Sequence, residues 1–134
     1  MRHIVQLPEL ALGELEQTVL ELLWSEDALN PGEVHSRVGV ERGISINTVS
    51  SALKRLHEKG LLNRVKVSHS YVYSAAITRA ELQRQLISAI AHRFADEERS
   101  GLLAAFVEVA GDGGEETLRQ LEALIAERLA ESAE

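Results

Sequence analysis

The sequence predicts a mainly α-helical chain with one small β-hairpin, an α+β fold. Three observations predict it. In residues 12–59, apolar side chains recur at the three- and four-residue spacing of helices. In residues 61–76, the spacing changes to the alternation that is typical of strands. In residues 78–129 the helical spacing returns, so the hairpin separates two helical parts of the chain.

The first two helices are predicted from their apolar spacing and their start signals. The segment LGELEQTVLELLW, residues 12–24, is an amphipathic helix. A second helix is predicted to start after Asn30, which can cap it, with Pro31 in its first turn. Glu33 can reach back to the cap and complete a capping box, and Gly39 is predicted to end the helix.

The third helix is predicted to begin at the N-cap Ser45 and to run to about Lys59. Gly60 suits the left-handed conformation that often ends a helix. On a helical wheel of about 100° per residue, four apolar residues fall within one narrow arc, which we expect to face the core. They are Ile46, Val49, Leu53 and Leu56.

The segments LLNRVKV and YVYSAA are rich in the β-branched and aromatic residues that favour strands. The polar turn SHS, residues 68–70, joins them, so they form a predicted hairpin.

Length and composition exclude several classes of protein. The chain has 134 residues, enough for one domain with a substantial core or for one small domain with an appended helical arm. No apolar run is long enough to span a membrane, and acidic residues interrupt the N-terminus where a signal peptide would be apolar. The absence of cysteine removes disulfides and thiolate metal sites and fits a cytoplasmic location.

Charge is distributed unevenly along the chain. The formal net charge is -7, which does not favour general affinity for nucleic acid. From Arg42 to Tyr73, however, there are six bases and one acid, a net of +5, whereas from Arg79 onward six bases face twelve acids, a net of -6. One basic face is therefore expected to meet an anion while the rest repels it.

The face of the third helix opposite its core arc carries short polar side chains first and cations one or two turns later. Short polar groups can approach base edges in a major groove, and cations can reach phosphates. Together with the three helices and the hairpin, this face predicts a winged helix-turn-helix that binds double-stranded DNA. The predicted DNA-binding residues are Ser45, Asn47, Thr48, Ser51, Lys54 and Arg55 on the helix and Arg64, Lys66, Ser68, His69 and Ser70 on the hairpin, with Tyr71 as a further candidate for a phosphate contact.

The C-terminal helices carry apolar stripes that are too short to bury alone and too apolar to leave in water. We therefore expect a second copy of the chain to cover them, which makes the protein a homodimer. The predicted domains are a DNA-binding domain in residues 1–77 and a dimerisation domain in residues 78–134. The predicted dimerisation residues are Leu82, Leu86, Ile90, Phe94, Leu102, Phe106, Leu118, Leu121, Ile125 and Leu129.

Enzyme motifs are incomplete, so neither catalysis nor a cofactor or metal ion is expected. HEKGL begins like the zinc-protease motif HExxH, but Leu61 stands where the second histidine is needed. The five histidines are scattered, GDGG lacks the spacing of a phosphate-binding loop, and no serine or threonine lies in a nucleophile elbow.

Five segments resemble, in order and spacing, the penicillinase-repressor family of bacterial regulators, the BlaI/MecI type. They are LGELEQTVLELLW, NPGEVHSRV, GISINTVSSALKRLHEKGLLNR, YVYSAAITRAEL and LLAAFVE, and the resemblance covers about Leu12 to Leu129. It implies an N-terminal winged-helix domain, a C-terminal arm through which two chains dimerise, and repression by binding inverted-repeat operators.

The resemblance also bears on how the protein could be inactivated. In some family members a membrane sensor with a metalloprotease domain cleaves the arm just before a Phe. The matching bond here joins Ala105 to Phe106, although the family pattern usually has a polar or larger residue where Ala105 stands. A copper-responsive branch uses cysteine pairs, which this sequence lacks.

Two alternatives remain open from the sequence. The winged helix could serve protein contacts without binding DNA, in which case neutralising Lys54, Arg55, Arg64 and Lys66 would leave activity unchanged. The chain could also hold a small-molecule effector between the winged domain and the arm, although no polar cluster in an apolar pocket is visible in the sequence.

Overall fold

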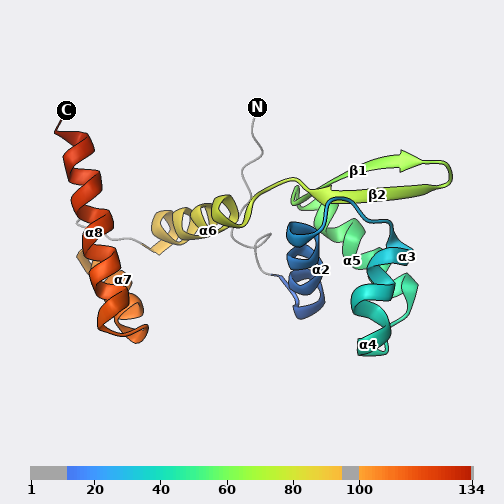
Figure 1. The fold of residues 1–134 in the computed structure, drawn as a ribbon, viewed down its shortest axis with the longest axis horizontal. Coiled ribbons are helices and arrows are strands. Elements are labelled where there is room, and N and C mark those ends of the chain that lie inside the picture. The colour runs from blue at the N-terminus through green and yellow to red at the C-terminus, as the bar shows by residue number, and fades with distance from the viewer. Residues whose placement is uncertain (1–11, 95–99, 134) are drawn as a thin grey trace. The chain divides into compact units, whose positions relative to one another are not determined.

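The computed structural model describes residues 12–94 and 100–133, and it confirms the predicted fold class. Of these, residues 12–89 form one compact unit and the described residues from Ile90 form a second one, and each is described by itself. The elements, labelled in Figure 1, are α2 (Glu14–Ser25), α3 (Pro31–Val34), the π-helical turn η1 (His35–Gly39), α4 (Val40–Arg42), α5 (Ile46–Glu58), β1 (Leu62–Val67), β2 (Ser70–Ala75), α6 (Arg79–Phe94), α7 (Ser100–Asp112) and α8 (Glu115–Ser132).

The start of the second helix follows the prediction and its end does not. The Asn30 side chain accepts from the backbone N–H of Glu33 at 2.8 Å, and the Glu33 carboxylate accepts from the backbone N–H of Asn30 at 3.0 Å. The predicted end at Gly39 is wrong, because the chain continues through η1 into α4. Helical conformation ends at Gly43, whose φ of 68° is left-handed and therefore favours glycine.

The α5 helix has the predicted cap and end. Ser45 accepts from the backbone N–H of Thr48, and Gly60 follows the helix with a φ of 82°. The prediction that Ile46 faces the core is wrong, since Ile46 is 45% exposed. Ile44, the residue just before the cap, packs against the core instead. This is the position of the first residue of a hydrophobic staple, a motif in which an apolar residue before the cap packs against one in the second turn of the helix.

The predicted hairpin is confirmed as an antiparallel pair. Leu62 lies opposite Ala75 and Val67 opposite Ser70, so the turn consists of Ser68 and His69. In Figure 1 this hairpin, called the wing below, extends away from α2 and α5. It is joined to the connector between α2 and α3 by two backbone hydrogen bonds between Leu29 and Tyr73, of 3.0 and 2.8 Å.

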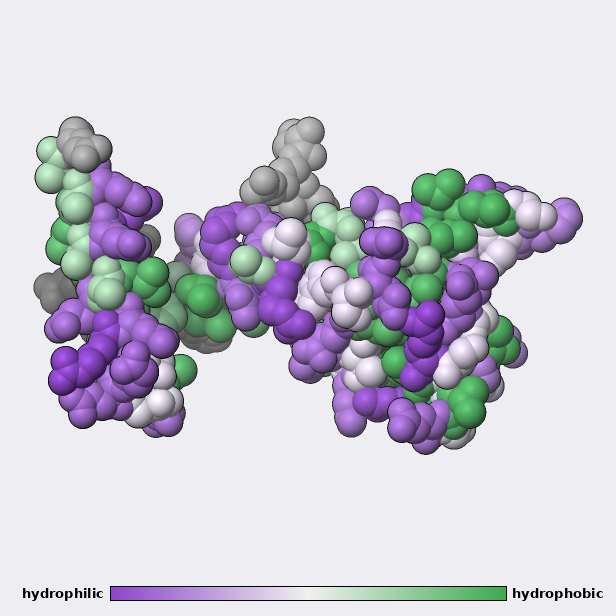
Figure 2. All heavy atoms as spheres, in the orientation of Figure 1, coloured by the Kyte–Doolittle hydropathy of each residue, from purple (hydrophilic) through white to green (hydrophobic). Residues whose placement is uncertain are grey.

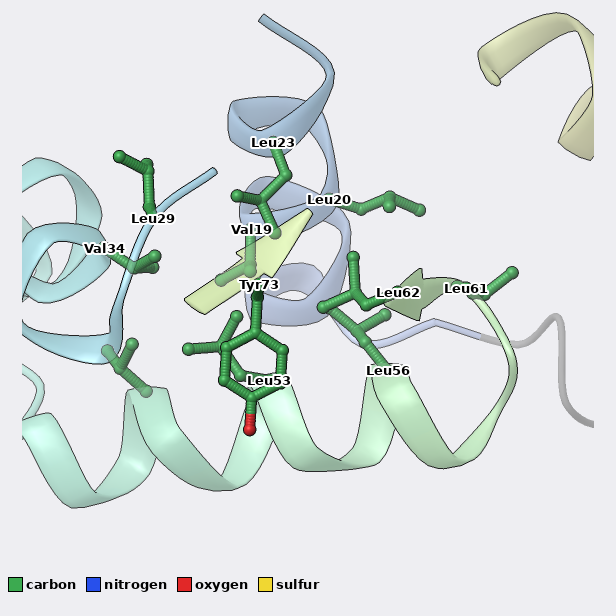
Figure 3. Packing of buried hydrophobic residues seen from close by; sticks show 11 residues of the cluster. Val19, Leu20, Leu23, Leu29, Val34, Leu53, Leu56, Leu61, Leu62 and Tyr73 are labelled. Carbon is green, nitrogen blue, oxygen red and sulfur yellow. The ribbon is translucent and has the colours of Figure 1, made fainter. Parts of the chain in front are cut away.

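The core of the first unit lies between α2, α5 and the base of the wing. Figure 3 shows the Tyr73 ring pointing from β2 toward α5, beside Leu53. The packing joins residues that are far apart in the sequence, so α5 is held rigidly on the side opposite its polar face. The buried cluster is Val19, Leu20, Leu23, Leu29, Val34, Val49, Leu53, Leu56, Leu61, Leu62 and Tyr73.

The segment between the wing and α6 is fixed to α2. The indole N–H of Trp24 donates to the carbonyl of Ile77 at 2.7 Å, and the Arg79 guanidinium lies 4.5 Å from the centre of the Trp24 ring. Leu82 and Ala89 of α6 pack against the buried cluster. The first turns of α6 therefore belong with the winged unit, while the predicted domain boundary at residues 77 and 78 stays a prediction.

In the second unit, α7 and α8 form a helical hairpin joined at Gly113 and Gly114. Gly114 has a φ of 93°, which other residues rarely adopt. Neither helix buries a single residue. Exposed apolar side chains include Leu103, Val107, Val109, Leu124 and Leu129. The two helices alone therefore lack the buried core that holds a small unit together.

Candidate nucleic-acid interface

The N-terminal half of α5 presents the polar face that the helical wheel predicts. Asn47, Thr48, Ser51 and Lys54 are all exposed, while Val49 and Leu53 on the other side are fully buried. The buried side fixes the orientation of the helix, so the polar face points to solvent as a preformed surface. Its side chains are short before Lys54, which leaves room for close approach by a flat or concave partner.

The hydroxyl groups of Ser45 and Thr48 lie 3.1 Å apart at the start of this face. Because Ser45 Oγ already accepts from the backbone N–H of Thr48 at 3.2 Å, its own proton is available to Thr48 Oγ1. The Thr48 hydroxyl can then donate outward to an acceptor such as a base edge. Ser45 thus serves mainly as the cap of α5 and as an orienting partner of Thr48.

Half of the bases in the basic segment are paired with acids of α2. Lys59 Nζ lies 2.7 Å from Glu16 Oε2, and Arg55 Nε lies 3.7 Å from Glu16 Oε1. Arg42 is 3.4 Å from the carboxylate of Glu14. The local net charge of +5 counted along the sequence therefore overstates the charge that a ligand meets, and Arg55 is partly neutralised.

The remaining cations of this segment are Lys54, Arg64 and Lys66. Among the residues that the structure describes, none of the three forms an ion pair. The guanidinium of Arg64 lies 4.1 Å from the centre of the Tyr71 ring, a cation–π distance. Tyr71 therefore supports Arg64 by stacking, a role that the sequence did not indicate because the two residues meet only across the hairpin.

The register of the wing divides its side chains between two faces. Leu62, Arg64 and Lys66 lie opposite Ala75, Tyr73 and Tyr71, so these six share the face that covers the core at the base of the wing. The cations continue this face toward the tip, where Ser68, His69 and Ser70 are exposed. Ser68 has a φ of 59°, unusual for serine, and it makes the tight turn that presents the tip.

The predicted dimerisation residues fall into two groups. Leu82 packs against the core of its own winged unit and so is partly covered without a partner. All of those on α7 and α8 are exposed or half-buried, and so are Leu86 and Ile90 on α6. The side chain of Phe94 lies outside the described residues.

Comparison with known proteins identifies the family. The sequence pattern of the family described as Penicillinase repressor matches residues 12–127. The chain belongs to the penicillinase repressor family. A curated relative, the penicillinase repressor of Bacillus licheniformis, is 26% identical over 111 residues, which cover 83% of this chain and 85% of that protein.

A solved structure supports the winged-helix assignment of the repressor. The solution structure of the DNA binding domain of the repressor BlaI has 26% sequence identity and a TM-score of 0.50, and the match covers 60% of this chain and 93% of that one. By family and fold, the chain is a winged-helix transcriptional repressor and not an enzyme. None of the helices in residues 12–94 and 100–133 is long and apolar enough to cross a membrane.

Proposed function

We propose that this repressor binds inverted-repeat DNA operators as a homodimer, with the polar face of α5 in the major groove and the wing along the adjacent backbone. The observation that carries the proposal is the set of cations left unpaired in the described residues, Lys54, Arg64 and Lys66, beside the exposed polar start of α5. The similar domain of the repressor BlaI is a DNA binding domain, which supports the same role here.

The two kinds of side chain have different tasks in this proposal. Thr48 and Ser51 are short hydrogen-bonding groups on an exposed helical face, so they suit contacts with base edges. Lys54 follows on the same helix, and Arg64 and Lys66 lie on the wing, where they suit phosphates. Phosphate contacts hold the domain on the duplex, and the base contacts select the sequence.

Dimerisation is supported by the second unit. Because α7 and α8 bury none of their residues, they need a further apolar surface to be stable. A second copy offers a complementary surface of the same kind, and two-fold symmetry then pairs two recognition helices with an inverted repeat. The apolar residues available for this contact are Leu103, Phe106, Val107, Val109, Leu118, Leu124, Ile125 and Leu129.

Salt dependence tests the DNA part of the proposal. The affinity of the purified protein for duplex DNA is measured at two or more salt concentrations. We expect the logarithm of the affinity to fall linearly with the logarithm of the salt concentration, with a slope that reflects several phosphate contacts per dimer, because each contact releases counterions. Absent or salt-independent binding would contradict the proposal.

One observation favours the alternative of a protein contact without DNA. The wing face opposite its cations carries Val65 and Val67, which are 65% and 56% exposed. Figure 2 shows hydrophobic residues gathered on the wing. If the salt test fails, this apolar face is the first place to look for a protein partner.

Proteolytic inactivation remains a separate prediction. The bond between Ala105 and Phe106 lies in the middle of α7, and both residues are exposed. A protease binds its substrate in an extended conformation, so cleavage by a membrane-sensor metalloprotease would require α7 to unwind locally first. If a purified sensor domain leaves the bond between Ala105 and Phe106 uncleaved, the prediction of proteolytic inactivation is contradicted.

A further inference from the structure

The loop into the recognition helix α5 is held at one residue, Ile44, directly before the N-cap Ser45. Nε2 of His35 lies 2.8 Å from the carbonyl oxygen of Ile44, a contact in which the imidazole N–H donates. The backbone N–H of Ile44 donates to the carbonyl of Gly39 at 3.0 Å. Both backbone polar groups of Ile44 are therefore bonded to the π-helical turn η1.

Gly39 makes room for this arrangement. Its backbone is in the ordinary right-handed helical region, with a φ of -84°, so conformation does not require glycine there. Space does. A Cβ atom on residue 39 would overlap Cδ2 of His35 and would lie 3.2 Å from Cγ2 of Val49 in α5. The glycine lets the imidazole ring reach Ile44 and lets η1 approach α5 closely.

The π-turn itself is the second unusual feature at this place. π-helical turns are rare, and they occur mostly as single turns within α-helices, often at functional sites. Here the turn places His35 and Gly39 together at the point where the helix meets the start of α5. A regular α-helix would be expected for such a segment. The π-turn therefore departs from regular helix at the place where the chain contacts the start of α5.

We propose that His35 and Gly39 are positioning residues that set where the recognition helix begins, and so align Thr48 and Ser51 with base edges. The inference rests on the proposed DNA-binding function and adds two residues to it that do not touch DNA. A hydrogen bond to Ile44 acts one residue ahead of the Ser45 cap, so its loss changes the alignment of the first turn without removing a phosphate contact.

The test uses the full chain and an operator selected from random duplex DNA. His35→Phe keeps a ring without the donor, and His35→Gln restores a donor. Gly39→Ala introduces the overlapping Cβ, although helix propensity alone would make it stabilising. Ser36→Ala is the matched control, because the Ser36 hydroxyl is next in the chain to His35 but donates to the carbonyl of Gly32 and not to Ile44.

We expect His35→Phe and Gly39→Ala to lower operator affinity by about threefold to tenfold, the effect of one hydrogen bond. Their discrimination between operator and random DNA should fall, while the salt slope stays unchanged because no phosphate contact is lost. His35→Gln and Ser36→Ala should bind within about twofold of the natural protein. Gly39→Ala should lower operator affinity less in a His35→Ala background than in the natural chain, because the imidazole ring with which the new Cβ would clash is absent.

The outcomes separate this inference from the function on which it rests. Unchanged affinity and discrimination in His35→Phe, or equal losses in His35→Gln, would overturn the positioning role alone. Failure of the natural protein to select any operator would overturn the proposed function and this inference with it. Fluorescence of Trp24, the single tryptophan, verifies that each variant is folded, and Gly39→Ala carries the test if His35→Phe does not fold.

Discussion

The ammonium group of Lys59, the C-cap residue of α5, lies 2.7 Å from the carboxylate of Glu16, a residue of α2 that is only 8% exposed. Arg55 of α5 approaches the same carboxylate at 3.7 Å. A buried carboxylate is costly unless cations neutralise it, so this triad links the recognition helix to the first helix. The single negative charge of Glu16 offsets one of these two positive charges, so Lys59 is neutralised and Arg55 only partly.

We predict that Glu16→Gln lowers the free energy of unfolding by about 1–2 kcal/mol. Breaking a buried pair costs more than that, but Arg55 is half exposed and Lys59 partly so, and solvent screens both. Urea denaturation measures the change. Glu14→Gln is the control, because the pair of Glu14 with Arg42 is exposed and should contribute under about 0.5 kcal/mol. Equal effects of the two substitutions would contradict the role of burial.

Lys54→Ala should weaken binding to every DNA sequence and reduce the salt slope of the dimer by about two, because it removes one phosphate contact from each of the two subunits. Arg42→Ala removes the same charge from the same basic segment, but Glu14 already neutralises Arg42. Its slope should therefore stay at the natural value. Titrations of both variants at several salt concentrations make the comparison. A slope that falls equally in both would mean that pairing with α2 does not decide which cations meet DNA.

Thr48→Val and Ser51→Ala should lower discrimination between operator and random DNA more than total affinity. Each removes a hydroxyl from the exposed polar face of α5, where one good base contact is worth about 1–3 kcal/mol. Ser50→Ala, on the same helix but beside the buried stripe, should change neither quantity. Parallel titrations of operator and random duplexes give the ratio. If affinity for both DNAs falls in proportion, these side chains do not read bases.

Tyr71→Leu should weaken binding to all DNA by about twofold to fivefold, because Arg64 loses the ring on which it stacks and an exposed cation–π contact is worth about 0.5–1 kcal/mol. Tyr71→Phe keeps the ring and should retain most of the affinity. A loss in Tyr71→Phe as large as that in Tyr71→Leu would instead indicate that the tyrosine hydroxyl itself contacts phosphate. Fluorescence anisotropy with a labelled duplex is sufficient for this measurement.

Ile125→Asp should split the dimer, since it places a charge among the exposed apolar residues of α8. Ala123→Asp adds the same charge to the same helix on the side away from these apolar residues and should leave the dimer intact. Sedimentation at low protein concentration measures both. Leu82→Ala offers a contrast, because it should lower the stability of the winged unit and not the association. A dimeric Ile125→Asp protein would contradict the role of the arm.

Local signals in the sequence were sufficient for most element boundaries. Some signals depend only on residues that are close together in the sequence, so the sequence alone is sufficient to predict them. They are the capping box of Asn30 and Glu33, the cap Ser45 and the alternation around residues 68–70. Gly39 was ambiguous because glycine serves both to end a helix and to allow close packing. Only the positions of His35 and Val49 decide between these uses.

The parts that could not be predicted depend on distant residues. A charge count along residues 42–73 cannot reveal that Glu16 neutralises Lys59, 43 positions away. A helical stripe also cannot tell a contact within one chain from a contact between two. Leu82 packs on its own core, while Ile125 on α8 is exposed, yet both lie on predicted stripes. The choice of Ile44 over Ile46 as the core residue likewise depends on packing around the start of α5.

Selection from a random pool of duplex DNA, with sequencing of the bound fraction at two salt concentrations, tests the central claim most directly. We expect an enriched inverted repeat whose half-sites are separated by one or more helical turns, with an affinity that falls steeply as salt rises. No enriched sequence at either salt concentration would contradict the claim that this repressor reads an operator through α5.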